Sequence, residues 1–145
     1  MINGDQMMTD AAQFNALSEG LLPSLLGVQV SDVGEREVRA TIDLKPFHMA
    51  PNGFLHAATV LGLADTACGY GCTANLPEGA ESFTTVELKS NHLGTARQGT
   101  ITCVATAEHM GRTTQVWDAI VSHEQTGKTI ALFRCTQMIL YPRKR

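Results

Sequence analysis

The sequence predicts an α+β fold in which one long helix is wrapped by a curved antiparallel sheet of five or six strands. Residues 55–75 are apolar almost all round, so a helix there must be covered by protein on most sides. Most of the chain after residue 24 reads as strands, so a sheet has to provide that cover. With 145 residues and 43% hydrophobic content, the chain fits one domain with a substantial core.

We expect a short helical segment at residues 1–24, followed without a linker by the main domain at residues 25–145. Residues 9–19 have the pattern of an amphipathic helix, for which Thr9 or Asp10 is the expected cap. A second short turn with the sequence LLPSLLG comes next. The N-terminal segment is therefore expected to add a short helix to the main domain.

The main domain is expected to begin with a hairpin. Apolar and polar residues alternate over residues 38–44, which is typical of a half-buried strand, and residues 28–33 are its expected partner. The long helix follows at about residues 55–75 and ends before Pro77 and Gly79. Four further strands are expected at about residues 82–93, 99–109, 113–123 and 129–140.

Composition and charge exclude several classes of function. The net charge is -3, and the 11 Lys and Arg residues cluster only in the tail PRKR, which argues against a nucleic-acid-binding surface. The N-terminus lacks the pattern of a signal peptide, which favours a cytoplasmic protein. Residues 53–76 include Gly62, Gly69 and Gly71 as well as the ionisable His56 and Asp65, and have no basic flank, so we do not expect them to span a membrane.

The cysteines do not have the spacing of a zinc site. A disulfide between Cys68 and Cys72, one helical turn apart, would be strained. We therefore expect no metal site, a reducing compartment and free, buried thiols at Cys68, Cys72, Cys103 and Cys135.

Asp65 is a lone acid within the apolar helix. Burying it costs several kcal/mol unless something offsets the cost, so we expect it to have a chemical task. It could act as a nucleophile or as the base that activates water, and the sequence leaves both roles open. Free backbone N–H groups at the start of the same helix could stabilise an oxyanion.

The helix start and Asp65 are too far apart to act on one carbonyl within one chain. Residues 57 and 65 are about 12 Å apart at 1.5 Å per residue, and His56 and Asp65 point in nearly opposite directions. A second, antiparallel copy around a two-fold axis could bring its own helix start to Asp65. Two exposed edges of a curled sheet also favour pairing between copies. We expect a homodimer, or a tetramer built as a dimer of dimers.

Three motifs carry a resemblance to a known family: NGFLHAATVLGLADTA, TTVELKSNHL and HMGRTTQVW. In this order and spacing they resemble the acyl-CoA thioesterases of the hotdog superfamily, nearest to the phenylacetate-pathway and 4-hydroxybenzoyl-CoA thioesterases. The resemblance covers about residues 25–140. It implies a hotdog fold and hydrolysis of a short-chain, medium-chain or aryl acyl-CoA to a carboxylic acid and free coenzyme A. No cofactor is implied, and the acyl group stays open.

The resemblance assigns roles at the helix start. The family has His-Gly-Gly there, with an acid eight residues after the first glycine, and the matching residues are His56, Ala57, Ala58 and Asp65. The backbone N–H of Ala57 would be the oxyanion donor, while His56 would mainly hold the helix start. Alanine methyl groups keep this donor but crowd the pocket and forbid dihedral angles that only glycine adopts.

The family also uses an Asn or Gln six residues before the histidine, where this chain has Ala50. Asn52 or His48 could take over that role, and a simple turn role for Asn52 is equally open. Thr85 matches a Ser or Thr that steadies the catalytic water in relatives, and ordinary strand propensity is the alternative. One branch has a threonine where Gly69 stands here, so its absence favours the version with Thr85.

The turn HMGRTT resembles the part of the family fold that lies beside coenzyme A. Gly111 and Arg112 are therefore candidates for substrate binding, with the Arg112 guanidinium on a phosphate. A solvated turn arginine is the alternative. Other basic candidates are Lys89, Arg134, Arg143, Lys144 and Arg145, and the candidates to line an acyl pocket are Phe47, Phe54 and Tyr70.

Two other functions remain open for this sequence. A non-catalytic module that binds acyl-CoA is made plausible by Ala50, Ala57 and Ala58. A hotdog hydratase or dehydratase would use a His and an Asp together on an enoyl group, which the LADTA context disfavours.

Overall fold

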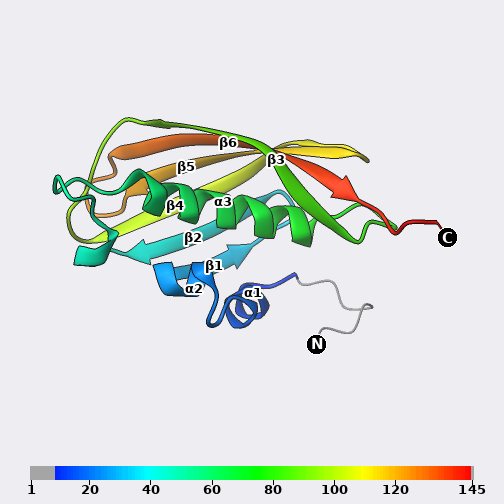
Figure 1. Ribbon diagram of the computed structural model, residues 1–145, viewed down its shortest axis with the longest axis horizontal. Helices are drawn as coiled ribbons and strands as arrows, with labels where there is room; N and C mark the ends of the chain where they lie inside the picture. Colours follow the sequence, from blue (N-terminus) through cyan, green and yellow to red (C-terminus); the bar gives the residue numbers. More distant parts are fainter. Residues whose placement is uncertain (1–8, 145) are drawn as a thin grey trace.

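The computed structural model describes residues 9–144 and shows an antiparallel sheet curled around one long helix (Figure 1). The sheet has six strands in the order β1-β2-β4-β5-β6-β3. The predicted α+β hotdog architecture is therefore confirmed. The helices are α1 (Ala11–Leu17), α2 (Leu22–Leu26), the 3-10 turn η1 (Pro46–His48) and α3 (Ala57–Ala74). The strands are β1 (Val28–Val33), β2 (Glu37–Asp43), β3 (Ser82–His92), β4 (Thr100–Met110), β5 (Thr114–His123) and β6 (Thr129–Leu140).

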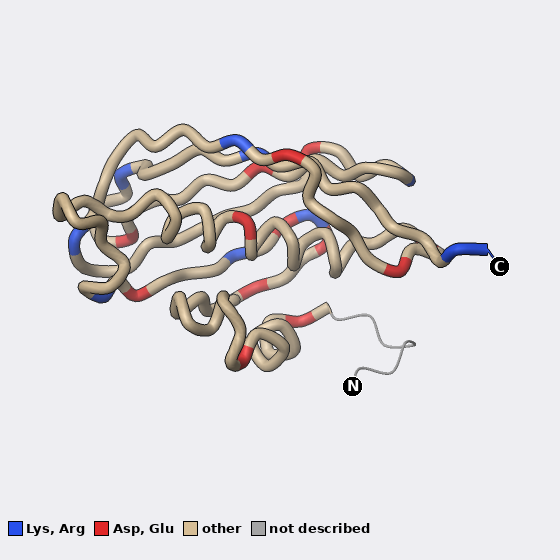
Figure 2. Tube along the Cα trace, viewed as in Figure 1, with Lys and Arg blue, Asp and Glu red and all other residues tan. Residues whose placement is uncertain are grey.

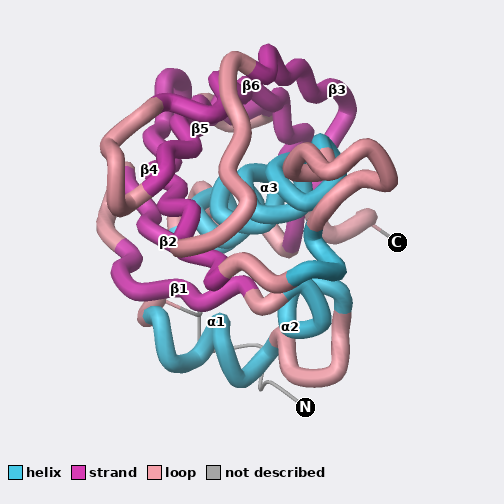
Figure 3. The backbone as a smooth tube through the Cα atoms, turned by 90° about the vertical axis from the view of Figure 1, so that its left-hand side faces the viewer, coloured by secondary structure: helices cyan, strands magenta, loops and turns pink. Residues whose placement is uncertain are grey.

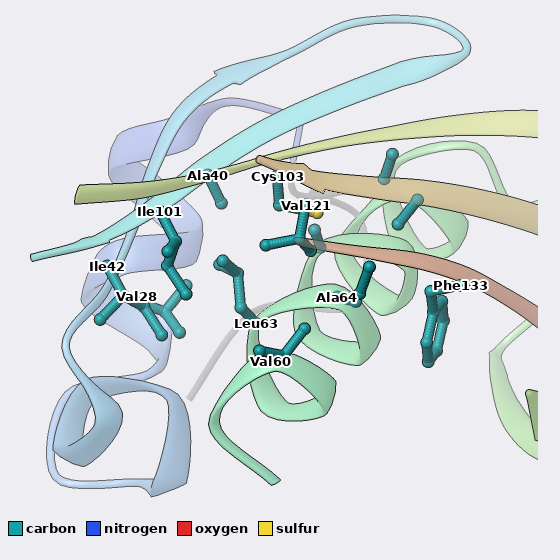
Figure 4. Close-up of a cluster of buried hydrophobic side chains, with 14 of the residues drawn as sticks. Val28, Ala40, Ile42, Val60, Leu63, Ala64, Ile101, Cys103, Val121 and Phe133 are labelled. Carbon is teal, nitrogen blue, oxygen red and sulfur yellow. The ribbon is translucent and has the colours of Figure 1, made fainter. Parts of the chain in front are cut away.

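The core lies between α3 and the concave face of the sheet, as the end-on view in Figure 3 shows. Every second residue of β4 and β5 points inward, which is the period of a strand with one buried face. In Figure 4, Val60, Leu63 and Ala64 of α3 face the strand residues. The sheet supplies Ile42, Ile101 and Val121 to this contact, among others.

Two glycines of α3 allow close packing. A Cβ atom at Gly71 would lie 2.5 Å from the ring of Trp117, so the helix can rest on this indole only because residue 71 has no side chain. A Cβ atom at Gly62 would lie 2.5 Å from Cδ1 of Leu26, where α2 packs on α3. The glycines that interrupt the apolar segment therefore serve the packing of a buried helix.

All four cysteines are free and buried, as predicted. Burial raises the pKa of the Cys72 and Cys103 thiols to about 12, so both stay protonated at neutral pH. They pack as small apolar side chains.

The two edges of the sheet differ. Helix α1 begins at the cap Asp10, whose carboxylate accepts from the Gln13 N–H, and lies beside β1. The side-chain amide of Asn15 donates to the Val30 carbonyl (2.9 Å) and accepts from the Val30 N–H (2.8 Å). Among the described residues, strand β3 has a paired strand on one side only. The sheet has two edge strands, as expected, but at β1 the side chain of Asn15 already occupies the peptide groups of Val30.

No helix among residues 9–144 has both the length and the hydropathy needed to cross a membrane. Asp65 is the only charged residue of α3, and Figure 2 shows the helix free of charge on both sides of it.

Candidate active site

The loop before α3 is held by His48, which is wholly buried. Its Nδ1 accepts from the Lys45 N–H (2.9 Å), so Nε2 carries the proton and donates to the Leu26 carbonyl (2.6 Å). Both ring nitrogens are used, so His48 cannot replace the amide that is missing at Ala50. Asn52 accepts from the Phe54 N–H through Oδ1 (3.2 Å), which is the turn role considered for it.

His56 caps α3. Its Nδ1 accepts from the Ala58 N–H (2.9 Å), and its carbonyl accepts from the Thr59 N–H (3.0 Å). The helix therefore begins at Ala57, two residues later than predicted, because the side chain of His56 ends the preceding loop. Its place as N-cap agrees with the expected role of holding the helix start.

Capping by His56 leaves one backbone N–H group at this end of the helix available as a hydrogen-bond donor. The Ala58 N–H is engaged, whereas the Ala57 N–H has no hydrogen-bond partner within residues 9–144, and both alanines are exposed. Neither alanine has a positive φ, so the conformation does not require glycine. The expected loss of glycine-only dihedral angles therefore has no cost at this helix start. The Ala57 N–H is free to donate to an oxyanion.

Asp65 lies in the middle of α3 and is partly buried. Its Oδ1 is buried and has no hydrogen-bond partner in the described part of the chain. Burial raises the pKa of this carboxyl group because the charged form loses hydration. An unpartnered carboxylate oxygen with a raised pKa suits either a base that takes a proton from water or a nucleophile.

Thr85 lies beside this part of the helix. Strand β3 runs back along α3 (Figure 1). The ring of Phe83 would be 3.2 Å from a Cβ atom at Gly69, one turn beyond Asp65. Phe83 and Thr85 are two residues apart and therefore point to the same face of β3. Because β3 runs antiparallel to α3, Thr85 lies nearer than Phe83 does to the helical turn that contains Asp65. The Thr85 hydroxyl donates to Oε1 of Gln137 (2.6 Å).

The structure does not bring the oxyanion donor and the acid together within one chain. Ala57 starts α3 and Asp65 is eight residues further, which is about 12 Å along the axis. Arg112 is at the opposite end of the molecule from Ala57. It belongs to the β4–β5 turn, and Gln115 just after that turn donates to the carbonyl of Asn75, the C-cap of α3.

Gly111 and Arg112 have structural partners in this turn. A Cβ atom at Gly111 would lie 3.1 Å from the Thr114 carbonyl oxygen and 2.6 Å from Nε2 of His109, so a side chain there would require the His109 ring to move. The carbonyl of Arg112 accepts from the Tyr141 hydroxyl, and its guanidinium lies 5.8 Å from the centre of the Tyr141 ring. The guanidinium is exposed and makes no ion pair with a carboxylate of residues 9–144.

The candidate aromatic residues fall into two groups. Tyr70 stacks on Phe14 at 4.5 Å and belongs to the core rather than to a pocket. Phe54 is exposed beneath the guanidinium of Arg97, and Phe47 is exposed beside the helix start. Phe47 borders a cavity of about 290 Å³ that is lined mainly by apolar side chains of α2, η1 and α3. Its other lining residues are Leu22, Leu26, Met49, His56, Ala58, Thr59 and Gly62.

Two of the remaining basic candidates lie on the outer face of the sheet, away from α3. Lys89 and Arg134 are neighbours on the outer face of the sheet, and Arg134 pairs with Asp118 (2.8 Å). Arg143 and Lys144 follow the last strand, and Arg145 lies outside the described residues. Within residues 9–144, no three His, Cys, Asp or Glu side chains come together as a metal site would require.

Gln137, the partner of Thr85, was missed in the sequence. It occupies an inward position of β6, between the buried residues Cys135 and Ile139, so a polar residue in the apolar phase of the strand was the available signal. Gln115 carries the same signal on β5.

The fold and the site define a hotdog-fold thioester hydrolase. A family model described as the thioesterase superfamily matches residues 52–130, and the chain belongs to this family. It is 30% identical to the 1,4-dihydroxy-2-naphthoyl-CoA hydrolase of Escherichia coli, over 87% of this chain and 91% of the relative.

Solved structures agree with this assignment. A thioesterase from Haemophilus influenzae superimposes with a TM-score of 0.86 at 27% identity, over 100% of this chain and 99% of that chain. The PaaI protein from the phenylacetic acid degradation operon of E. coli has the same fold, with a TM-score of 0.77 at 24% identity. The match covers 90% of this chain and 91% of the PaaI chain.

Proposed function

We propose that the protein hydrolyses an acyl-CoA thioester to a carboxylic acid and free coenzyme A, with Asp65 as the general base. The buried Oδ1 of Asp65, which has no partner among residues 9–144, carries this proposal. A structural aspartate at that depth would be hydrogen-bonded. The hydroxyl group of Thr85, an exposed residue on the adjacent strand, favours the version in which water attacks over the version in which Asp65 attacks.

The reaction then has two steps. Water attacks the thioester carbonyl carbon, Asp65 takes one proton from that water, and the carbonyl oxygen becomes an oxyanion held by the Ala57 N–H. When the oxyanion collapses, the carbon–sulfur bond breaks and the coenzyme A sulfur leaves with the electron pair. Asp65 returns the proton to this sulfur, so the products are the acid and a thiol.

The active unit in this proposal is a homodimer, or a tetramer built from two such dimers, in which each site uses Asp65 of one chain and Ala57 of the other. The separation of about 12 Å between these residues along α3 supports it. The open edge of β3 supplies a surface on which two copies could pair antiparallel.

For the substrate, we propose an aromatic or medium-chain acyl-CoA. The name of the E. coli relative supports an aromatic acyl group, and the cavity of about 290 Å³ beside the helix start is lined mainly by apolar side chains. Arg112 would bind a phosphate of coenzyme A from the far end of α3. The enzyme would work in the cytoplasm without a metal or redox cofactor.

The decisive experiment measures thiol release from short-chain, medium-chain and aryl acyl-CoA esters. Turnover that is highest for aromatic or medium-chain esters is the expected result. Binding without thiol release would overturn the proposal in favour of a binding module. Addition of water to crotonyl-CoA, without cleavage of the thioester, would replace it with a hydratase.

The shared site is tested by mixing two inactive variants. Asp65→Asn removes the base, and Ala57→Pro removes the donor N–H at the first helical position, where proline is tolerated. A mixed dimer would contain one native site, so mixing should restore activity. Native mass spectrometry would verify that mixed dimers form, and mixed dimers without activity would refute a two-chain site.

A further inference from the structure

Three polar side chains lie in a row across the concave side of the sheet. In the register of the strands, Thr85 of β3 stands opposite Gln137 of β6, and Gln137 stands opposite Gln115 of β5. Thr85 is exposed at the open edge, whereas both glutamines are completely buried. A buried amide costs free energy unless its groups are hydrogen-bonded, so the partners of each glutamine indicate what it does.

Gln137 is oriented by its neighbours. Its Nε2 donates to the Cys135 sulfur (3.5 Å), and its Oε1 is left to accept from the Thr85 hydroxyl (2.6 Å). Gln137 is therefore an acceptor toward Thr85, and its place deep in the sheet fixes the direction in which that hydroxyl points.

This hydrogen bond determines whether Thr85 can donate to a water molecule or only accept from it. A hydroxyl group has one O–H to donate and two lone pairs to accept with, and the Thr85 O–H already donates to Gln137. Toward a water on the side of Asp65, Thr85 can then only accept. A water that donates one O–H to Thr85 and the other to Asp65 keeps its lone pair for the carbonyl carbon. If the Thr85 proton were free, it could instead bind that lone pair or the Asp65 carboxylate and oppose the attack.

We infer that Gln137 is a positioning residue for hydrolysis, which acts by holding Thr85 as an acceptor for the attacking water. The inference rests on the proposed function, because it concerns the water that Asp65 activates. It adds a residue that does not touch the substrate and lies on a strand away from the helix motif.

Gln115 provides a matched control. It is equally buried and is next to Gln137 in the register, but its Oε1 accepts from the Trp117 indole N–H (2.8 Å) and its Nε2 donates to the Asn75 carbonyl (2.9 Å). Both ends of this amide hold structural groups. Loss of Gln115 should therefore affect stability without a specific effect on turnover.

The test is a double-mutant cycle with a CoA ester that the wild type hydrolyses. Gln137→Met should lower kcat about fivefold, the effect of one hydrogen bond, and leave KM within about twofold. Thr85→Val should lower kcat about tenfold. The double variant should be no slower than Thr85→Val alone, because Gln137 acts through the hydroxyl that is already missing. Thr85→Ser should stay within about threefold of the wild type, because it keeps the hydroxyl.

Several results would overturn the inference: losses that multiply in the double variant, an unchanged kcat in Gln137→Met, or an equal loss of kcat in Gln115→Met. An inactive wild type would refute the proposed function instead. If Gln137→Met does not fold, the amide side-chain NMR signals of Gln137 can be compared between wild type and Thr85→Val. These signals should shift and exchange faster with solvent in Thr85→Val, and unchanged signals would rule out the contact.

Discussion

The two edges of the sheet have opposite properties. At β1, Asn15 occupies both outward peptide groups of Val30, so another strand cannot pair there without displacing it. At β3, an 11-residue strand has an open side, with Val86 51% and Leu88 44% exposed. A long, open and partly apolar edge is a surface for strand pairing, whereas a short edge covered by a side chain is not. The molecule therefore has one edge available for a second copy.

The open edge is also where the candidate chemistry lies. Thr85 is on β3 and Gln137 is on its neighbour β6, whereas the covered side of the sheet contributes no candidate catalytic residue. This difference suggests that the β1 side is built for stability alone. The β3 side keeps polar groups accessible and leaves Oδ1 of Asp65 without a partner in the part of the chain that the structure describes.

Asp65→Asn should lower kcat at least about a hundredfold, because it removes the base while keeping the shape of the side chain. Steady-state thiol release measures this, and circular dichroism checks that the fold is intact. Activity within about threefold of the wild type would end the assignment of Asp65 as the base and leave the open side without its main catalytic group.

Val86→Lys should weaken dimer formation at least about tenfold, because pairing of two β3 edges would bring two lysine charges close together. Ser31→Lys places the same charge at the covered β1 edge and should leave the dimer unchanged. Sedimentation equilibrium gives the dissociation constants of both variants. Equal weakening by both substitutions would show that the two edges do not differ as described.

Asn15→Ala should lower the free energy of unfolding by about 1–3 kcal/mol, because the partly buried peptide groups of Val30 lose both hydrogen bonds. Turnover per folded chain should not change. Thermal unfolding gives the loss of stability, and Gln29→Ala, an exposed position on the same strand, is the control. Loss of turnover without loss of stability would mean that the covered edge also serves catalysis.

Arg112→Ala should raise KM for a CoA ester about threefold, with kcat almost unchanged, because an exposed phosphate contact is equally strong in the ground and transition states. An acyl-pantetheine ester, which lacks the nucleotide, is the control substrate and should show no change. Equal effects on both substrates would show that Arg112 does not contact a phosphate.

The parts of the fold that depend on periodicity could be predicted from the sequence. The strands 28–33 and 38–44 and the apolar helix follow from periods of two and from an apolar run that needs cover. The ends of α3 differ from the prediction because side chains set them. His56 caps the start, and Asn75 at the other end donates through Nδ2 to the Gly71 carbonyl (2.8 Å).

Features that depend on contacts between distant residues could not be predicted in this way. Asn15 covers Val30 across 15 residues, and Thr85 meets Gln137 across 52 residues. His48 appeared available for a substrate, but only the structure shows that the Leu26 carbonyl occupies one of its nitrogens. A local sequence pattern contains no information about such partners. Asp65 and the start of α3 could therefore be proposed from the sequence, whereas Gln137, the partner of Thr85, could not.

The smallest expected effect concerns the free energy that it costs to bury the ionised carboxylate of Asp65. Burial raises the pKa of this carboxyl group, so the native state binds its proton more tightly than the unfolded chain does. The contribution of Asp65 to stability is therefore largest below the ordinary carboxyl pKa of about 4 and is lost as the pH rises through the native pKa. Asp65→Asn removes this titration, so its melting temperature should exceed that of the wild type at pH 7.

The difference between Asp65→Asn and the wild type should shrink as the pH is lowered and disappear below about pH 4. Thermal unfolding across this range measures it, and Asp32→Asn on the covered β1 edge controls for the loss of one negative charge at an exposed site. If Asp65→Asn were instead less stable than the wild type at pH 7, the carboxylate would be stabilising the fold. Asp65 would then be a structural residue, like Asn15 at the β1 edge. The proposed difference between the β1 and β3 sides of the sheet would not hold for the residue on which the proposed chemistry depends.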